Sequence, residues 1–333
     1  MGSDREGDAV KMQATQRKGS PGAKGQRVTE TPLFVIALRC GRLANRMVLF
    51  ANFIALVEER GGRLVNFTFH SYADSFQATR RDIYCQYPAP RAPGLLDLAP
   101  LARVIKKTRV LYHSVRALGK LNQRFPVLGR TVVTLREAEA EGTTSLETTA
   151  TEELFRGSKA IFVYGWKFRA PEYVKRHAEK IRQFFKPVDE LDQLSRQAVE
   201  RLREQAEVVV GVHIRHGDYP TLNGGQFFFP ISRYLSWMQE LEALFPGKRV
   251  SFLVCSDEPR REGEFPGLSV GFGPGSAVTD LYALAYCDYI MGPMSTFSQW
   301  SSFYGNTPLF HIMGSEARIE LDRFTVSFLA EIP

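Results

Sequence analysis

The strongest constraint on the fold is a regular alternation of short apolar runs and helical patterns in the second half of the chain. Apolar runs that end in polar or glycine residues predict buried strands over 208–214, 250–255, 268–272, 289–292 and 309–312. Apolar residues spaced by three or four positions predict helices over 191–205, 232–245, 278–286 and from 296 onward. Strands that alternate with helices in this way are typical of a doubly wound α/β domain with a parallel sheet.

The first half begins another α/β unit. An apolar run at 33–38 predicts a strand, and a helical pattern from 43 to 57 predicts a helix that ends at Gly61 and Gly62. A strand at 64–69 would complete one β-α-β unit. Further along, the sequence predicts a Thr/Glu-rich loop at 139–153, a strand at 159–166 and a helix at 173–185.

These patterns divide the chain into three parts. Its 333 residues fit two domains of ordinary size. We expect a disordered polar tail over 1–30, a Rossmann-like domain over 31–188 and a second Rossmann-like domain over 189–333. The most economical architecture is two such α/β domains that face a cleft.

The basic residues are concentrated in one segment. The chain has 43 Lys and Arg against 36 Asp and Glu, but nine of the basic residues and no acid lie between Leu98 and Arg136. Without those nine, 34 basic residues face 36 acidic ones, a net charge of −2. A general attraction to nucleic acid is therefore not expected, and a nucleic-acid-binding module is the weakest alternative.

The cysteines and the apolar runs indicate the compartment. Cys40, Cys85, Cys255 and Cys287 are scattered and form no Cys-x-x-Cys pair, so a disulfide framework and a structural zinc site are not expected. No apolar run approaches the ~20 residues that cross a bilayer, and no signal-peptide pattern precedes the first strand. We expect a cytoplasmic protein, and the sequence does not indicate an oligomeric state.

Polar side chains follow the strand at 208–214, where an open α/β sheet binds its ligands. His213 and Arg215 alternate to the same side of the strand end, and Asp218 lies in the turn that follows. Arginine suits a diphosphate because its planar fork forms bidentate, charge-assisted hydrogen bonds. A salt-bridged Arg–Asp turn explains the same residues without a ligand.

Three other loops lie at the same ends of predicted strands. The carboxylate of Asp257 can accept hydrogen bonds from the ring N–H and amino group of a guanine, or it can cap a helix. A helix start with hydroxyl side chains can receive a phosphate, or it can be a plain cap; here it contains Ser295, Thr296 and Ser298. The loop from Gly41 to Asn45 is a further candidate, and its alternative is a tight turn with no ligand.

Together these segments resemble one enzyme family. The motifs H-x-R-[RH]-x-D-Y at 213–219, S-D at 256–257 and S-T-F-S-x-W at 295–300 resemble GDP-fucose-dependent fucosyltransferases of the α-1,2 type (glycosyltransferase family 11) and of the related α-1,6 group. The G-x-L-x-N-x-M loop at 41–47 is similar to the G-G-L-G-N-Q-M loop of the α-1,2 branch, and 164–185 resembles that branch's G-Y-x-Q-S-x-x-Y-F segment. His216 stands where the family usually has a second arginine.

The resemblance implies the GT-B fold, with the donor nucleotide mainly on the C-terminal domain and the acceptor mainly on the N-terminal one. Arg215 would hold the β-phosphate of the donor, and His213 and Asp257 the guanosine. Asp218 would act as a base or orient Arg215. The other donor-binding positions implied are Ser295, Thr296, Ser298, Asn45 and Gly41.

The implied activity is an inverting transfer of fucose from GDP-fucose to a hydroxyl of an oligosaccharide or lipid-linked glycan, in α-1,2 linkage. The chain has no Asp-x-Asp, the pair that holds Mn²⁺ on the diphosphate in GT-A enzymes, so we expect neither a metal nor another cofactor. Two alternatives stay open: a GT-B enzyme that uses another nucleotide sugar, and a degenerate relative that only binds glycan.

The basic segment at 98–136 has its own apolar pattern. Its first part carries apolar residues close to helical spacing, with most of the Lys and Arg residues at other positions. A basic amphipathic helix can contact an anionic membrane surface, which would suit an enzyme with a lipid-linked acceptor. The alternative is an ordinary surface helix whose apolar stripe is buried in the core.

Overall fold

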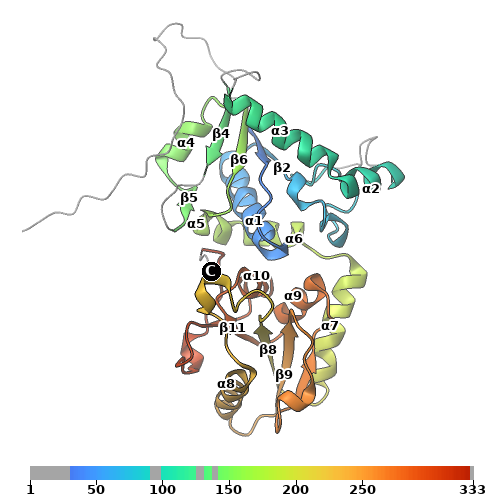
Figure 1. Ribbon diagram of the computed structural model, residues 1–333, viewed down its shortest axis with the longest axis vertical. Coiled ribbons are helices and arrows are strands. Elements are labelled where there is room, and N and C mark those ends of the chain that lie inside the picture. The colour runs from blue at the N-terminus through green and yellow to red at the C-terminus, as the bar shows by residue number, and fades with distance from the viewer. Residues whose placement is uncertain (1–30, 91–98, 125–130, 137–141, 331–333) are drawn as a thin grey trace, which may run out of the picture. The chain divides into compact units, whose positions relative to one another are not determined.

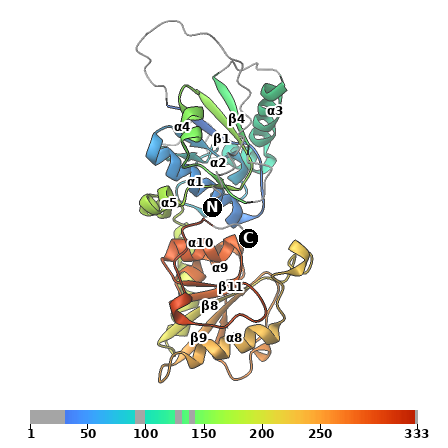
Figure 2. The ribbon, with the colours of Figure 1, turned by 90° about the vertical axis from the view of Figure 1, so that its left-hand side faces the viewer.

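The computed structural model describes residues 31–90, 99–124, 131–136 and 142–330, which form two α/β units (Figures 1 and 2). The first unit holds 31–40, Leu49–Ala73 and the described residues of Arg81–Tyr173. The second holds Gly41–Val48, Asp74–Arg80 and the chain from Val174 onward. Among the described residues, no helix combines the length and the apolar character that a membrane-spanning segment needs.

The first unit is built on a five-stranded sheet in the order β3-β2-β1-β6-β4. All neighbouring strands are parallel except the edge strand β3, which is antiparallel to β2. Helix α1 (Leu43–Arg60) joins β1 to β2 and confirms the predicted β-α-β unit. The strands are β1 (Leu33–Ile36), β2 (Arg63–Val65), β3 (Gln86–Tyr87), β4 (Val132–Arg136) and β6 (Ala160–Tyr164).

Helices cover both faces of this sheet (Figure 2). Successive strand residues point to opposite faces, so Phe34 packs against Phe53 of α1 while Val35 packs with Tyr112 on the other face. The other helices are α2 (Ala99–Thr108), α3 (Val110–Arg124), α4 (Thr149–Phe155) and α5 (Pro171–Arg176), and β5 (Thr144–Ser145) pairs in parallel with β7 (Phe168–Arg169).

The first unit departs from the sequence prediction in the strand that follows α1 and in the loop expected at 139–153. The strand expected at 64–69 ends at Val65, because the Asn66 side chain accepts hydrogen bonds from the backbone N–H and the hydroxyl of Thr68 and turns the chain into a short 3₁₀ helix. The loop expected at 139–153 contains the start of α4, which the side chain of Thr148 caps. Its residues 139–141 lie outside the described residues, as does the predicted tail at 1–30.

The second unit contains a parallel sheet in the order β10-β9-β8-β11-β12. The strands are β8 (Val208–Ile214), β9 (Val250–Ser256), β10 (Val270–Phe272), β11 (Tyr289–Pro293) and β12 (Leu309–Ile312). The helices are α6 (Ala178–Phe184), α7 (Asp189–Arg203), α8 (Ile231–Ala243), α9 (Ala277–Ala285) and α10 (Thr296–Gly305). The predicted alternation of strand and helix is confirmed, with ends that differ by one or two residues.

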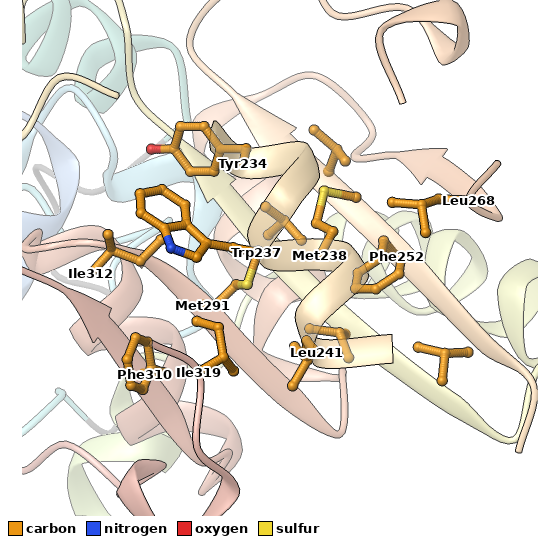
Figure 3. Packing of buried hydrophobic residues seen from close by; sticks show 14 of the residues in the cluster. Tyr234, Trp237, Met238, Leu241, Phe252, Leu268, Met291, Phe310, Ile312 and Ile319 are labelled. Atoms are coloured by element: carbon orange, nitrogen blue, oxygen red, sulfur yellow. The ribbon is translucent and has the colours of Figure 1, made fainter. Parts of the chain in front are cut away.

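Helix α8 packs on one face of the second sheet, through Trp237, Met238 and Leu241, which are fully buried against Phe252 and Met291 (Figure 3). Helices α7 and α9 pack on the other face, where Leu202 and Leu284 contact Val209, Leu253 and Ile290. Both faces are therefore apolar, as a central parallel strand such as β8 requires. In open α/β sheets of this kind, ligands bind beyond the carboxyl ends of the strands.

The predicted helix at 173–185 is two short helices, α5 and α6. The domain boundary that we predicted at 188/189 lies between α6 and α7, whereas α6 itself groups with the second unit. Two contacts explain this grouping: Tyr282 donates a hydrogen bond to the carbonyl of Phe185, and Arg182 donates one to the carbonyl of Phe303.

Candidate functional site

The candidate site lies at the carboxyl ends of β8, β9 and β11. The chain runs outward from β8 to β9 and β10 on one side and to β11 and β12 on the other, so β8 and β11 flank the topological switch point. Ligands of open α/β sheets bind beyond the strand ends at such a point. The parallel register pairs His213 with Cys255 and Ile214 with Ser256, which brings the loop after β8 beside the loop after β9.

Arg215 and Asp218 form a bidentate pair in the first of these loops. Nε and Nη2 of Arg215 donate to the two carboxylate oxygens of Asp218 over 2.9 and 2.8 Å. The guanidinium also lies 4.6 Å from the centre of the Tyr219 ring. Burial alone would lower the pKa of Arg215, but the hydrogen bonds to Asp218 raise it. Arg215 is therefore a fixed cation.

The hydrogen bonds from Arg215 also affect whether Asp218 can act as a base. The hydrogen bonds from Arg215 hold the pKa of Asp218 below its ordinary value. A carboxylate whose two oxygens already accept from a guanidinium is a weak proton acceptor. Of the two roles that the sequence left open, the geometry favours orienting Arg215 over acting as a base.

Asp257 holds the backbone of the same loop. Its Oδ1 accepts hydrogen bonds from the backbone N–H groups of His216 (2.9 Å) and Gly217 (3.2 Å). A Cβ at Gly217 would lie 2.9 Å from Oδ2 of Asp257, so a side chain there would push the carboxylate away. Asp257 thus fixes the turn that carries Arg215 through Oδ1, and Oδ2 takes no part in these two hydrogen bonds.

The loop before α1 contributes a second arginine. Arg42 lies 3.6 Å from Oδ2 of Asp218 and 3.9 Å from Oδ2 of Asp257, and two thirds of its side chain is exposed. Gly41 has a φ of +58°, which favours glycine, and its carbonyl accepts two hydrogen bonds from Arg46. Two cations and two carboxylates therefore meet at this end of the sheet, a suitable setting for an anionic ligand with polar hydroxyls.

His213 is buried and neutral. It stacks on Phe297 with ring centres 4.9 Å apart, and its Nδ1 lies 3.4 Å from the hydroxyl oxygen of Ser298. Burial, and then the positive charge of Arg215, lower the pKa of His213 to about 3. An imidazole with so low a pKa is a weak proton acceptor, and the contacts of His213 with Phe297 and Ser298 are packing and hydrogen bonding.

The start of α10 uses most of its hydroxyl groups within the protein. Ser295 caps the helix by accepting a hydrogen bond from the backbone N–H of Phe297. Ser298 donates to a backbone carbonyl of the preceding turn, and the hydroxyl of Thr296 donates to the side chain of Asn45. The structure therefore places Asn45 beside the helix start. The helix dipole adds partial positive charge there.

The sequence assigned no role to three side chains near the site, and it marked one of them, His216, only as a departure from the family motif. His216 is buried in the loop that follows β8. Its Nε2 donates to the carbonyl of Phe229 and its Nδ1 accepts from Arg260, and these two bonds fix the tautomer. Arg260 is in turn paired with Glu258 and Glu264. Alternation along β8 could not reveal these contacts, because they come from distant segments.

Asp280 is the third missed residue. It lies in the first turn of α9, where Oδ1 accepts a hydrogen bond from the backbone N–H of Gly275. Cys255 donates its thiol hydrogen to the backbone carbonyl of Asp280, which places this carboxylate near the end of β9. Burial raises the pKa of Asp280 to about 6. The signal in the sequence was the glycine-rich stretch at 271–275 that precedes an acidic helix start.

The raised pKa of Asp280 predicts a pH-dependent stability. The folded protein binds this proton more tightly than the unfolded chain, so stability is lost as the pH rises from about 4 to about 6. We expect Asp280→Asn to raise the free energy of unfolding by about 1–2 kcal/mol at pH 7 and to have little effect below pH 4. Denaturant unfolding of both proteins across this range measures the difference, and a constant difference would contradict the assignment.

Metal ligands do not gather in the part of the chain that the structure describes: no group of three His, Cys, Asp or Glu side chains could hold an ion there. The positive groups at the site are instead Arg215, Arg42 and the start of α10.

Comparisons with known proteins agree with this fold. No family model matches the chain. The chain is 31% identical over 155 residues to nodulation protein Z of Azorhizobium caulinodans, a match that covers 34% of this chain and 44% of that protein, so the similarity spans less than half of the relative's length.

Solved structures are similar over most of the chain. A mutant of Arabidopsis thaliana FUT1 in complex with GDP superposes with a TM-score of 0.52 at 14% identity, over 89% of this chain and 73% of that one. The fucosyltransferase NodZ from Bradyrhizobium gives a TM-score of 0.49 at 17% identity, over 84% and 95% of the two chains. The predicted α/β fold of the GT-B class, with its two largely parallel sheets, is confirmed.

Proposed function

We propose that this protein is an inverting fucosyltransferase that transfers fucose from GDP-fucose to a hydroxyl of a glycan. The observation that carries the proposal is the cluster of Arg215, Asp218, Asp257 and the α10 helix start at the switch point of the second sheet. Two features support it: the structure of the same fold cited above was solved with GDP, and the sequence motifs of the cluster resemble those of fucosyltransferases.

The reaction breaks the bond between C1 of fucose and the β-phosphate oxygen. The acceptor hydroxyl attacks C1 from the opposite face, and its proton leaves to solvent or to a base that we do not assign. The electron pair of the broken bond stays on GDP, so negative charge grows on the β-phosphate. Arg215, held by Asp218 and Tyr219, would stabilise this charge without reorganising.

A donor screen tests the proposal. The purified full chain is incubated with GDP-fucose, GDP-mannose, a UDP-sugar and a set of oligosaccharide acceptors, and both nucleotide release and sugar transfer are measured. Transfer from GDP-fucose alone supports the proposal. Transfer from another donor would identify the alternative GT-B enzyme. Binding of glycan with no turnover of any donor would identify the non-catalytic relative.

We also propose an α-1,2 linkage and an acceptor site on the first unit, as the sequence motifs imply. The G-x-L-x-N-x-M loop at 41–47 supports an α-1,2 linkage, and a donor site on the second unit would leave the acceptor to the first. Linkage analysis of the product decides the first point: a 6-linked fucose would overturn the α-1,2 linkage and leave fucosyl transfer intact. A cytoplasmic location also remains a proposal.

Metal independence gives a prediction of its own. The chain lacks an Asp-x-Asp pair, and we expect the guanidinium of Arg215 and the α10 N-terminus to balance the charge of the leaving diphosphate. Excess EDTA should therefore change the rate of transfer by less than about twofold. Loss of activity on chelation that Mn²⁺ restores would contradict the mechanism.

A further inference from the structure

Helices α2 and α3 present a basic and apolar surface to solvent. Their exposed apolar side chains are Val104 (57%), Val110 (56%), Leu118 (39%) and Leu121 (48%), although valine and leucine are among the residue types most often buried. Exposed basic residues lie among them. We call this set the outer face of α2–α3, and it comprises Val104, Lys107, Arg109, Val110, Leu118, Lys120 and Leu121.

These apolar residues do not belong to the core. The inward side of α3 is occupied by Tyr112, which packs with Phe162 and Tyr164 of β6. A Cβ at Gly119 would lie 2.3 Å from the Tyr164 hydroxyl, so the helix already contacts the sheet closely. The apolar pattern predicted from the sequence therefore divides: one stripe is buried, and a second stripe faces solvent.

The outer stripe follows helical spacing. Val110, Leu118 and Leu121 lie within about 80° of one another around α3, at 100° per residue, and Lys120 flanks them on one side. Val104 and Lys107 continue the same composition on α2. No acidic residue occurs anywhere between 98 and 136. The surface thus combines aliphatic side chains with an uninterrupted positive charge.

We propose that the outer face of α2–α3 binds the surface of an anionic phospholipid membrane. Lys107, Arg109 and Lys120 would face the phosphate groups, and the aliphatic side chains would enter the boundary between headgroups and acyl chains. A nucleic acid offers phosphates but nothing that removes leucine and valine from water. The combination of both features therefore favours lipid over a polyanion.

Vesicle flotation tests this with the full chain. At low salt we expect the protein to float with vesicles of phosphatidylcholine mixed with phosphatidylglycerol and not with phosphatidylcholine alone. Each basic residue near such a surface contributes about 1 kcal/mol, a factor of about five in the partition coefficient. The double variant Lys107→Glu/Lys120→Glu should thus bind more than about twentyfold more weakly, and high salt should release the wild type.

Two further variants separate lipid from polyanion binding. Leu118→Ser/Leu121→Ser keeps every charge and should lose vesicle binding while retaining any binding to duplex DNA. Leu194→Ser and Lys248→Glu change equally exposed residues of the second unit and should bind vesicles as the wild type does. Because all these positions are exposed, thermal unfolding should stay unchanged.

The outcomes that overturn the proposal are definite. The membrane proposal is wrong if the wild type does not float with anionic vesicles at low salt. It is also wrong if the charge-reversal variant or the serine variant floats as well as the wild type. Equal binding to DNA and vesicles, with no effect of the serine changes, would reassign the surface to polyanions in general.

Discussion

Replacing Arg215 with alanine is expected to slow fucosyl transfer by about two to three orders of magnitude. Removal of one preorganised donor to a developing negative charge costs about 2.7–4 kcal/mol of barrier. Arg215 fits that description because Asp218 accepts hydrogen bonds from its Nε and Nη2 and Tyr219 lies against its face. The measurement is the single-turnover rate with saturating GDP-fucose.

Two control variants make this result interpretable. Arg215→Lys keeps the charge but not the fork, so it should recover only part of the rate. Arg203 is also paired bidentately, with Asp288, through Nη1 and Nη2 over 3.0 and 2.8 Å, at the amino ends of the strands. Arg203→Ala should therefore leave transfer nearly unchanged. A folded Arg215→Ala protein with near-normal turnover would show that Arg215 does not contact the diphosphate.

The second half of the fold was predictable because its strands are buried on both faces. A seven-residue apolar run such as 208–214 is predicted as a strand with few alternatives when helices with a clear apolar face flank it.

The first half was harder to predict. Its strands β3 and β7 have two residues each, too few for a periodic pattern. The end of β2 and the start of α4 depend on hydrogen bonds to the side chains of Asn66 and Thr148, from Thr68 and Thr151, which propensity does not reveal.

Within the candidate site, the sequence could predict contacts between neighbouring residues but not contacts between distant segments. Arg215 and Asp218 are three residues apart, so their pairing follows from the local turn. The bonds from His216 and Gly217 to Asp257 depend on the register of β8 with β9, which no local pattern encodes. Asp280 was overlooked because an acidic residue at a helix start looks like an ordinary favourable charge.

Asp257→Ala is expected to weaken GDP binding by about 1.5–3 kcal/mol, the range for hydrogen bonds to a charged group. The resemblance to fucosyltransferases implies that this carboxylate contacts the guanine edge, and in the structure its Oδ1 accepts hydrogen bonds from the backbone N–H groups of His216 and Gly217. Both effects act in the same direction. Titration calorimetry with GDP measures the loss, and titration with ADP, whose base lacks the matching donors, measures the selectivity of the wild type.

Asp257→Asn separates the two roles. The asparagine oxygen can still accept from the two backbone N–H groups, but the amide nitrogen in place of Oδ2 repels a guanine N–H. If Asp257 reads the base, the asparagine variant should lose GDP affinity nearly as alanine does and discriminate less against ADP. If it only holds the loop, the asparagine variant should bind GDP like the wild type. Asp280→Asn is the matched comparison, because Asp280 is another carboxylate at this end of the sheet with one oxygen bonded to a backbone N–H. Loss of GDP selectivity in Asp280→Asn alone would transfer the guanine contact to Asp280 and leave Asp257 as the residue that positions Arg215.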